Sequence, residues 1–487
     1  MTSGLPQTDS ACNQAGAPAG ADRGAPGGMT LVEMLVAMTA TLLLMAAVAQ
    51  AFAVFGSAIT GSRGVLDLDA RMRSAAWRLR RDLAGITVRP LPPITPESAQ
   101  GYLEIIEGSA TDSAATAGTE IGPTDCDDVL LFTTQTTNPP FAGRAPGANP
   151  TFESTVAEVA WFARPTPGTS KPPTYTLYRR QALVMGYVGV PPFSNGGTNS
   201  VAWATAGSSW SAFYNSPCDV SVRRERDASG LFDRLVPNTL ADLSRREARF
   251  MHNLSGTAPF PYFLLSGSSH QAVVTGNPTQ LPAALAGLTF DPVIGVDDDG
   301  DSTTDEAGER APRQGEDVVL TDVVAFDVRV FDSEVAVQLP GSTPLVPGDP
   351  SFVIAALTTS MATGAYVDLG HGAGTNSVLP GVTPRFSGNG QTVGGTTSLT
   401  TANGAVYDTW SLAYEANGRD EDGSFGVDQA FDGQDNNTNN LIDDPAEFET
   451  RPPYPYPLRG IEVRIRCYEP ESRQVRQVTI RHTFVPH

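Results

Sequence analysis

The clearest pattern in the chain is a long apolar segment close to its N-terminus. Residues 34 to 55 contain no charged side chain, and their strongly polar members are Thr39, Thr41 and Gln50. At 1.5 Å per residue this segment makes about 33 Å of α-helix, enough to cross the hydrocarbon core of a bilayer. The pattern predicts a transmembrane helix within residues 29–55.

After residue 55 the apolar positions become periodic. They recur every three or four residues, as on one face of an amphipathic helix, at Leu68, Met72, Ala75, Ala76, Leu79, Leu83 and Ile86. Arginines fall mostly between them, at Arg71, Arg73, Arg78, Arg80 and Arg81. Glycines at 56, 61 and 64 could bend the helix, because each glycine costs about 1 kcal/mol relative to alanine. We predict an amphipathic helical extension over residues 56–90.

Beyond Pro90 the apolar positions alternate with polar ones, as in β-strands with one buried face. The alternating runs lie at 129–134, 156–163, 175–180, 318–331, 461–468 and 474–485. The last two runs flank Glu469-Pro470-Glu471-Ser472 and predict a hairpin. The expected fold class is α+β, in which a long helix is followed by an antiparallel β-rich head over residues 91–487.

Several long stretches of the head lack such periodicity. They are rich in Gly, Ser, Thr and Pro and lie at 136–155, 186–230, 255–290 and 338–405. This composition is typical of extended surface loops or insertions. We therefore expect loops there.

Composition narrows the function. Acidic residues number 53 and basic ones 32, the formal net charge is -21, and Lys171 is the only lysine. A surface that follows nucleic-acid phosphates needs clustered lysine and arginine, so no nucleic-acid partner is expected. Of the four cysteines, Cys12 lies in the N-terminal segment, and one pair among Cys126, Cys218 and Cys467 could form a disulfide in an oxidising compartment.

The N-terminal flank of the apolar segment carries a processing signal. Residues 1–28 are rich in Ala, Gly and Pro without apolar periodicity, which predicts an unfolded, removable leader. In Gly28-Met29-Thr30-Leu31-Val32-Glu33, a small residue precedes a helix that carries one carboxylate at the fifth residue after the possible cut. This sequence resembles the prepilin-type cleavage and methylation motif of type IV pilin-like proteins. The resemblance implies cleavage after Gly28 by a prepilin peptidase and methylation of the amino group of Met29.

Glu33 is the carboxylate that borders the apolar segment. An ionisable group near the end of a membrane helix is costly and usually has a partner. In the resembled family the partner is the N-terminal amine of a neighbouring subunit, so the resemblance implies that Glu33 sets the register of packed helices. The alternative is an ordinary anchor in which Glu33 lies at the headgroup boundary.

Four segments of the head are similar to segments of J-type minor pseudopilins and related minor pilins. They lie at 156–161, 177–180, 320–328 and 458–465. The resemblance implies a pseudopilin-like head and a minor pseudopilin that helps to initiate or cap the pseudopilus of a type II secretion-like system. Its implied partners are other pseudopilins or minor pilins and the inner-membrane assembly platform. The nearest alternative is a minor type IV pilin of a surface pilus.

The same motif implies an orientation. It places a single-pass protein in the cytoplasmic membrane, with its N-terminus in the cytoplasm and its head periplasmic or extracytoplasmic. Charge alone favours the opposite direction, because the positive-inside rule retains basic flanks in the cytoplasm and the arginines at 71–81 follow the helix. The expected localisation follows the motif, and these arginines could meet acidic faces of neighbouring subunits.

Two acidic regions, 297–306 and 420–447, predict metal binding. They contain three segments with oxygen-bearing side chains at offsets 0, 2, 4 and 8: Asp297, Asp299, Asp301 and Asp305; Asp420, Asp422, Ser424 and Asp428; and Asp435, Asn437, Asn439 and Asp443. Calcium takes six to eight such oxygens, as at positions 1, 3, 5 and 9 of an EF-hand loop. We expect calcium in at least one segment. The alternative is that Asp, Asn and Gly form solvated turns without metal.

The third segment is the most similar to an EF-hand loop. Asn440 replaces the glycine at position six, and Ala446 replaces the bidentate glutamate at position twelve. Asp444, Glu447 or Glu306 could supply missing oxygens. We expect this loop to be the best of the three candidate calcium sites.

Common catalytic motifs are missing from the sequence. It contains no His-Glu-x-x-His, Gly-x-Ser-x-Gly, Gly-Lys-Ser/Thr or Cys-x-x-Cys, and its five histidines are scattered. We do not expect an enzyme. Two alternatives from other classes are a membrane-anchored calcium-dependent binding module and an anchored hydrolase whose residues converge only in the tertiary structure.

Overall fold

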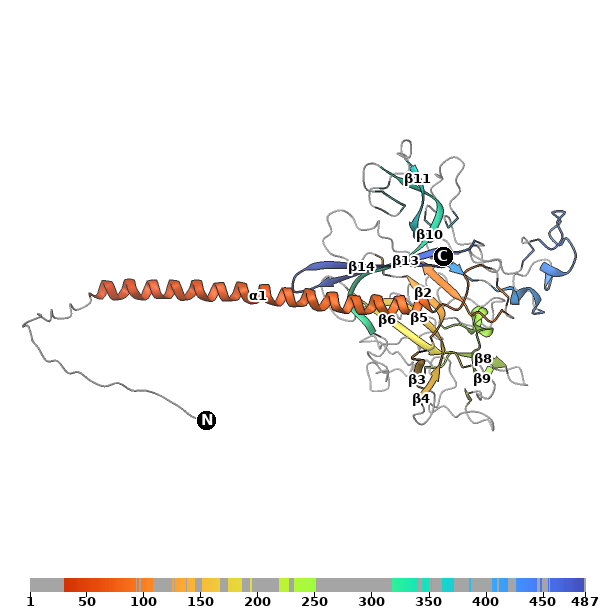
Figure 1. Cartoon of the computed structure of the whole chain (residues 1–487), viewed down its shortest axis with the longest axis horizontal. Helices are drawn as coiled ribbons and strands as arrows, with labels where there is room; N and C mark the ends of the chain where they lie inside the picture. Colours follow the sequence, from red (N-terminus) through yellow and green to blue (C-terminus); the bar gives the residue numbers. More distant parts are fainter. Residues whose placement is uncertain are drawn as a thin grey trace, which may run out of the picture. The chain divides into compact units, whose positions relative to one another are not determined.

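The fold was analysed in a computed structural model of the whole chain (Figure 1). It describes residues 30–92, 94–95, 98–107, 125–126, 128–136, 138–144, 151–166, 174–185, 193–194, 219–226, 232–250, 318–339, 344–347, 349, 352, 361–371, 385–386, 405–409, 411–418, 426–444, 447–448, 454 and 456–485. By its internal contacts the chain divides into two compact units, residues 1–61 and 62–487.

One long helix, α1 (Leu31–Ala84, 54 residues), contains the predicted apolar and amphipathic segments. Glycines 56, 61 and 64 all lie within α1, so none of them ends the helix. In the first unit the large apolar side chains of α1 are exposed, including Leu43 at 72% and Phe52 at 71%. No described residue of the chain buries these apolar side chains.

In the second unit, α1 has one buried face. The predicted apolar positions Leu68, Met72, Ala75, Ala76, Leu79 and Leu83 are all buried. They belong to one core with Trp161, Phe326 and Ile465 of the sheet. The five arginines between them are exposed, which confirms the predicted amphipathic face.

The helix ends at Ala84, six residues before the predicted boundary, because the following backbone pairs with the sheet. The Gln135 amide donates to the carbonyl of Gly85 at 2.8 Å, and the Thr87 amide donates to that of Thr133 at 3.0 Å. A Cβ on Gly85 would lie 2.3 Å from the carbonyl oxygen of Gln135. Only glycine fits this close approach, which ties the end of α1 to the sheet.

The main sheet has nine strands, and all its strand pairs are antiparallel (Figure 1). Its order is β12-β1-β2-β5-β6-β10-β13-β14, and β11 pairs with β10. The strands are β1 (Leu103–Glu107), β2 (Val129–Gln135), β5 (Val156–Pro165), β6 (Tyr175–Leu183), β10 (Val318–Gln338), β11 (Met361–Val367), β12 (Ala405–Asp408), β13 (Gly460–Glu469) and β14 (Gln474–Thr483). All six predicted runs are strands, and the fold is α+β.

Strand β10 holds the sheet together because it has three partners in turn. It pairs with β6 from Val318 to Val323, with β13 from Val323 to Val330, and with β11 from Val330 to Gln338. The predicted hairpin is confirmed, since β13 and β14 pair from Gly460↔Thr483 to Glu469↔Gln474. The sequence pattern had detected only part of β10, ending it at residue 331.

Three of the predicted loop stretches contain strands. The stretch 136–155 holds β3 (Phe141–Arg144) and β4 (Thr151–Ser154), which pair with each other. A further sheet has the order β7-β9-β8, formed by β7 (Phe193–Ser194), β8 (Val222–Arg226) and β9 (Phe232–Pro237). The stretch 186–230 contains β7 and β8, and 338–405 contains β11, so these predictions were wrong there.

The physical reason for these errors is that these strands carry little apolar alternation of their own, so the period-two pattern does not mark them. The stretch 255–290 lies outside the described residues. Four 3-10 helices complete the described elements: η3 (Asp242–Ser244), η4 (Arg246–Ala248), η9 (Leu412–Ala416) and η10 (Gln429–Phe431). Cys126 and Cys467 are both buried and no disulfide joins them, while Cys218 lies outside the described residues.

Candidate assembly helix and acidic sites

The first turn of α1 is capped by its own side chains. Glu33 Oε2 accepts from the Thr30 backbone amide at 2.9 Å and from Thr30 Oγ1 at 3.0 Å. In return, Thr30 Oγ1 accepts from the Glu33 amide at 3.3 Å. This reciprocal arrangement is a capping box, which satisfies amides that a helix N-terminus leaves without partners. Gly28 and Met29, the predicted cleavage and methylation residues, lie outside the described residues.

Glu33 therefore has a role that the sequence pattern did not indicate. Both bonds from Thr30 reach the same oxygen, Oε2, and the side chain is exposed. The carboxylate can cap the helix and still present Oε1 to a cation. Capping and charge pairing are thus compatible functions of one residue.

Helix α1 is long and apolar enough to cross a membrane. Its best 18-residue window has a mean hydropathy of 2.2, and none of that window is buried within the chain. An apolar surface of this length matches the hydrocarbon thickness of a bilayer. The chain thus has one N-terminal candidate for a membrane span among its described residues.

The amphipathic part of α1 is fastened to the sheet by a buried ion pair. Asp82 accepts from Arg179 Nε at 2.6 Å and from Arg179 Nη2 at 2.8 Å, in a bidentate pair. Asp82 also accepts from the Trp161 indole nitrogen at 3.0 Å. Both charged side chains are 4% exposed. Sequence reasoning missed Asp82 because it lies among the exposed arginines of α1.

The predicted acidic segments are described only in part. Asp297, Asp299, Asp301, Asp305, Asp420 and Asp422 lie outside the described residues. Asp428 is described and holds a turn, since its carboxylate accepts from the backbone amides of Asn417 at 3.0 Å and Gly418 at 2.9 Å. It therefore acts as a turn residue in the described structure.

The third acidic segment folds as a compact loop around its own oxygens. Asp435 accepts from the backbone amides of Asn439 at 3.0 Å and Asn440 at 2.7 Å. Asn437 Oδ1 accepts from the Asn439 amide at 3.0 Å, and Asn439 Oδ1 accepts from the Leu441 amide at 2.7 Å. Side-chain oxygens at positions one, three and five thus accept hydrogen bonds from the consecutive backbone amides of residues 439–441.

Asn440 stands where an EF-hand loop has glycine, and its backbone conformation accounts for the substitution. Its φ is +69°, in the left-handed region that asparagine tolerates better than most residues. Asp443 is also left-handed, with φ +51°, and its Oδ1 accepts from the Gly433 amide at 2.9 Å. The loop can thus make the sharp turn of a calcium loop without glycine.

The suggested extra ligands of this loop are engaged in other bonds. Glu447 is buried, and its Oε1 accepts from the backbone amides of Asn436 at 2.6 Å and Asn437 at 3.2 Å. Its Oε2 accepts from the backbone amide of Asp444 at 3.2 Å. The Asp444 carboxylate accepts from the side-chain amides of Asn437 and Asn439. Glu447 therefore closes the loop through backbone amides.

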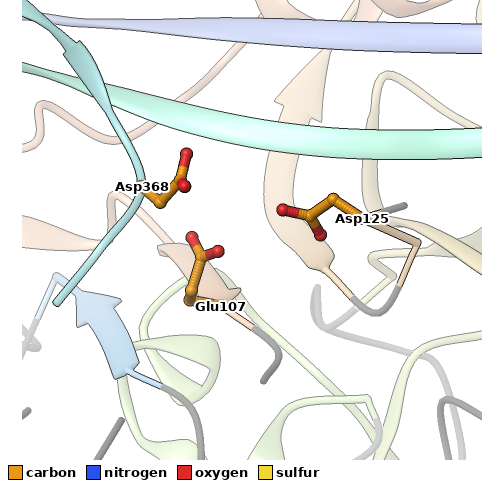
Figure 2. Close-up of side chains that lie close together, drawn as sticks. All are labelled: Glu107, Asp125 and Asp368. Carbon is orange, nitrogen blue, oxygen red and sulfur yellow. The ribbon is translucent and has the colours of Figure 1, made fainter. Parts of the chain in front are cut away.

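A second group of acidic residues, which the sequence analysis did not single out, lies inside the head. Glu107, Asp125 and Asp368 place one carboxylate oxygen each within 4.8 Å of one another, and so do Asp125, Asp128 and Asp327. All five side chains are buried. Figure 2 shows the carboxylates of Glu107, Asp125 and Asp368 gathered around a common space. We call these five residues the buried carboxylate cluster.

Backbone contacts explain how this cluster forms. Glu107 is the last residue of β1, Asp368 directly follows β11, and Asp327 lies within β10. The Phe326 amide donates to the carbonyl of Asp125 at 2.6 Å, which joins the segment before β2 to β10. Residues far apart in the chain meet here, so their spacing carried no signal.

A different buried network shows how the head neutralises other acids. Arg249 Nη1 donates to Glu104 Oε2 at 3.0 Å and to Asp408 Oδ1 at 2.7 Å, and Arg246 donates to Asp408 Oδ2. Burial would raise the pKa of Asp408, but Arg246 and Arg249 outweigh it and hold that pKa below its usual value. Here two carboxylates have two guanidinium partners.

Comparisons with protein-family models, with curated proteins and with solved structures found no match for this chain.

Proposed function

We propose that the protein is a minor pseudopilin, a membrane-anchored subunit that helps to initiate or cap the pseudopilus of a type II secretion-like system. The observation that carries the proposal is that the two parts of α1 differ in burial. Its first part is apolar and exposed, whereas residues 68–83 bury one face in a β-rich head. A pilin-like subunit needs both an unburied apolar helix for lipid and for neighbouring helices and a folded head.

The N-terminal flank gives this helix its assembly chemistry. Cleavage after Gly28 would leave Met29 as the new N-terminus, one residue before the capping box of Thr30 and Glu33. Glu33 Oε1 is then available to the methylated amine of a neighbouring subunit. The partners would be a prepilin peptidase, other pseudopilins or minor pilins and the inner-membrane assembly platform, with the N-terminus cytoplasmic and the head extracytoplasmic.

Mass spectrometry of the mature N-terminal peptide tests the family assignment. The expected peptide begins at Met29 and carries one added methyl group. A chain that keeps residue 1, or one cut after residue 55, would refute the proposal.

Three substitutions separate the charge of Glu33 from its capping role. Glu33→Gln keeps an acceptor oxygen for the Thr30 amide but removes the charge, because glutamine also forms a capping box. Thr30→Ala removes the cap's hydroxyl and keeps the charge, whereas Glu33→Ala removes both functions. We expect Glu33→Gln and Glu33→Ala to reduce co-purification with neighbouring pseudopilins about tenfold, with near-normal recovery for Thr30→Ala. Full recovery of Glu33→Gln would show that Glu33 acts only as a cap.

A second candidate function is a calcium-dependent binding module that is anchored but does not polymerise. The inward-facing oxygens of Asp435, Asn437 and Asn439 favour it, and we propose calcium as the ion for that loop. In this case Glu33→Ala leaves partner binding unchanged, and Asp435→Ala abolishes its calcium dependence. Partner binding by Glu33→Ala and Asp435→Ala therefore distinguishes the two functions. A minor type IV pilin would share the Glu33 result and differ in the filament with which it co-purifies.

A further inference from the structure

The buried carboxylate cluster brings five acidic side chains together in the interior of the head. Its members are Glu107, Asp125, Asp128, Asp327 and Asp368, and all are buried. Arg329, also buried, donates from Nε to Asp327 at 2.9 Å and approaches Asp368 Oδ1 at 3.0 Å. Arg464 reaches within 4.0 Å of Asp327 and also pairs with Glu462. Burying a carboxylate without compensating charge costs several kcal/mol, so a bound cation would stabilise such a cluster.

Glu107 is the member whose environment points to a missing partner. Its side chain is 4% exposed, and its Oε2 accepts from the Leu369 amide at 3.1 Å. Its Oε1 is buried and has no hydrogen-bond partner among the described residues. Figure 2 shows its carboxylate directed toward those of Asp368 and Asp125.

We propose that Glu107, Asp125 and Asp368 together bind one calcium ion in the interior of the head. Their oxygens lie within 4.8 Å of one another, and ligands at 2.3–2.6 Å from a calcium ion can be at most about 5 Å apart. Carboxylates are hard oxygen donors, which favour Ca²⁺ or Mg²⁺ over softer metals. Mg²⁺ usually keeps several waters, whereas Ca²⁺ accepts a cage of protein oxygens in flexible geometry. This buried setting therefore selects calcium.

The ion would connect segments that are distant in sequence. Glu107 ends β1, Asp125 precedes β2 and Asp368 follows β11. Calcium would thus crosslink the end of β1, the entry to β2 and the exit of β11, and would stabilise the folded head by binding only that state. This site is separate in sequence from the acidic loop at 435–443, and it does not depend on whether the protein polymerises.

Calcium titration of the full chain in detergent, by calorimetry and thermal unfolding after chelation, tests the site. Glu107→Gln keeps the size of the side chain and removes one negative charge. We expect this variant to bind one calcium ion fewer than the unaltered protein. At free calcium about 100-fold above the dissociation constant, the unaltered protein should unfold about 5 °C higher than without calcium. That increment should be lost in Glu107→Gln.

A matched control and a reference condition make the result specific. Asp435→Asn should lose any ion of the exposed loop and keep the Glu107-dependent increment. With calcium removed, Glu107→Gln should unfold at or above the midpoint of the unaltered protein, because it relieves repulsion. Asp125→Asn provides the same test if Glu107→Gln does not fold.

Two results would overturn the assignment. One is equal ion numbers and equal calcium-dependent shifts in the unaltered protein and in Glu107→Gln. The other is the same shift with Mg²⁺ at the same free concentration, which would show that the site does not select calcium.

Discussion

At the scale of single residues, stability depends on how buried charges are paired. Asp82 and Asp67 both lie on α1 and both pair with an arginine, but in different surroundings. The Asp82–Arg179 pair is 4% exposed on each side, whereas Asp67 and Arg71 are 69% and 43% exposed. Water screens the exposed pair and leaves it little net energy, while a broken buried pair leaves a charge without compensation.

This contrast gives a matched prediction. Asp82→Asn should lower the free energy of unfolding by about 3–5 kcal/mol, because Arg179 stays buried without a countercharge. Asp67→Asn should change it by less than about 1 kcal/mol. Denaturant unfolding of the full chain in detergent measures both. Similar losses in the two variants would contradict the anchoring role of Asp82.

Histidine 482 gives the head a pH dependence of known sign. Burial lowers its pKa below the usual value near 6.5. The unfolded chain therefore binds the proton first as the pH falls, so the stabilisation is complete above about pH 6.5 and is lost toward the lowered folded pKa. The thermal midpoint should fall more between pH 7.5 and 5.5 in the unaltered protein than in His482→Gln. Equal falls would exclude His482 as the cause.

At the scale of elements, the decisive junction is the end of α1. The helix stops at Ala84 because the next residues bond to β2, and Gly85 lets the two backbones approach. A helix that ended elsewhere would misplace the buried face formed by Leu68 to Leu83. The junction thus fixes which face of α1 packs in the core.

Replacement by alanine should change the free energy of unfolding in opposite directions at Gly56, which lies within α1, and at Gly85, which directly follows it. In Gly85→Ala the new Cβ would lie 2.3 Å from the Gln135 carbonyl oxygen and 2.5 Å from Thr134 Oγ1. We expect a loss of about 1–3 kcal/mol from this overpacking. Gly56 has no atom within 4 Å of such a Cβ, so Gly56→Ala should gain about 0.5–1 kcal/mol of helix stability. The denaturant midpoints of both variants measure this, and a stable Gly85→Ala would rule out the close approach.

At the scale of the whole molecule, the apolar part of α1 sets where the protein can reside. Its exposed leucines and phenylalanines have no core to cover them in the described chain. A bilayer could cover these side chains without any further folding.

Charges placed in the middle of the apolar segment should remove the protein from membranes. Leu43→Arg combined with Leu44→Arg adds about 2.5–3.5 kcal/mol per arginine to insertion. The fraction of protein that stays in the membrane pellet after an alkaline wash should fall severalfold. The control Leu43→Ile with Leu44→Ile should remain in the pellet. Equal retention of both variants would show that α1 does not anchor the chain.

Local periodicity explains what could be predicted. The positions from Leu68 to Leu83 and the runs of β13 and β14 each repeat with the period of their element, because one face must be buried. Short strands such as β3 and β12 lack such a repeat, and β12 pairs with β1, about 300 residues away in the chain. The acidic loop at 435–443 was recognisable because its oxygen-bearing side chains lie at fixed offsets within one short stretch.

By itself, the sequence determined the apolar span of α1, its amphipathic continuation, the long strands and the N-terminal motif, since each is encoded by neighbouring residues. Only the tertiary structure decided that Asp82 anchors α1 through Arg179 and that Glu107, Asp125 and Asp368 share one buried space. These groups belong to segments separated by up to hundreds of residues, and they meet only because the strands pair and because α1 packs on the sheet. The free energy that a buried charge contributes depends on such neighbours, and the spacing of residues along the chain does not specify them.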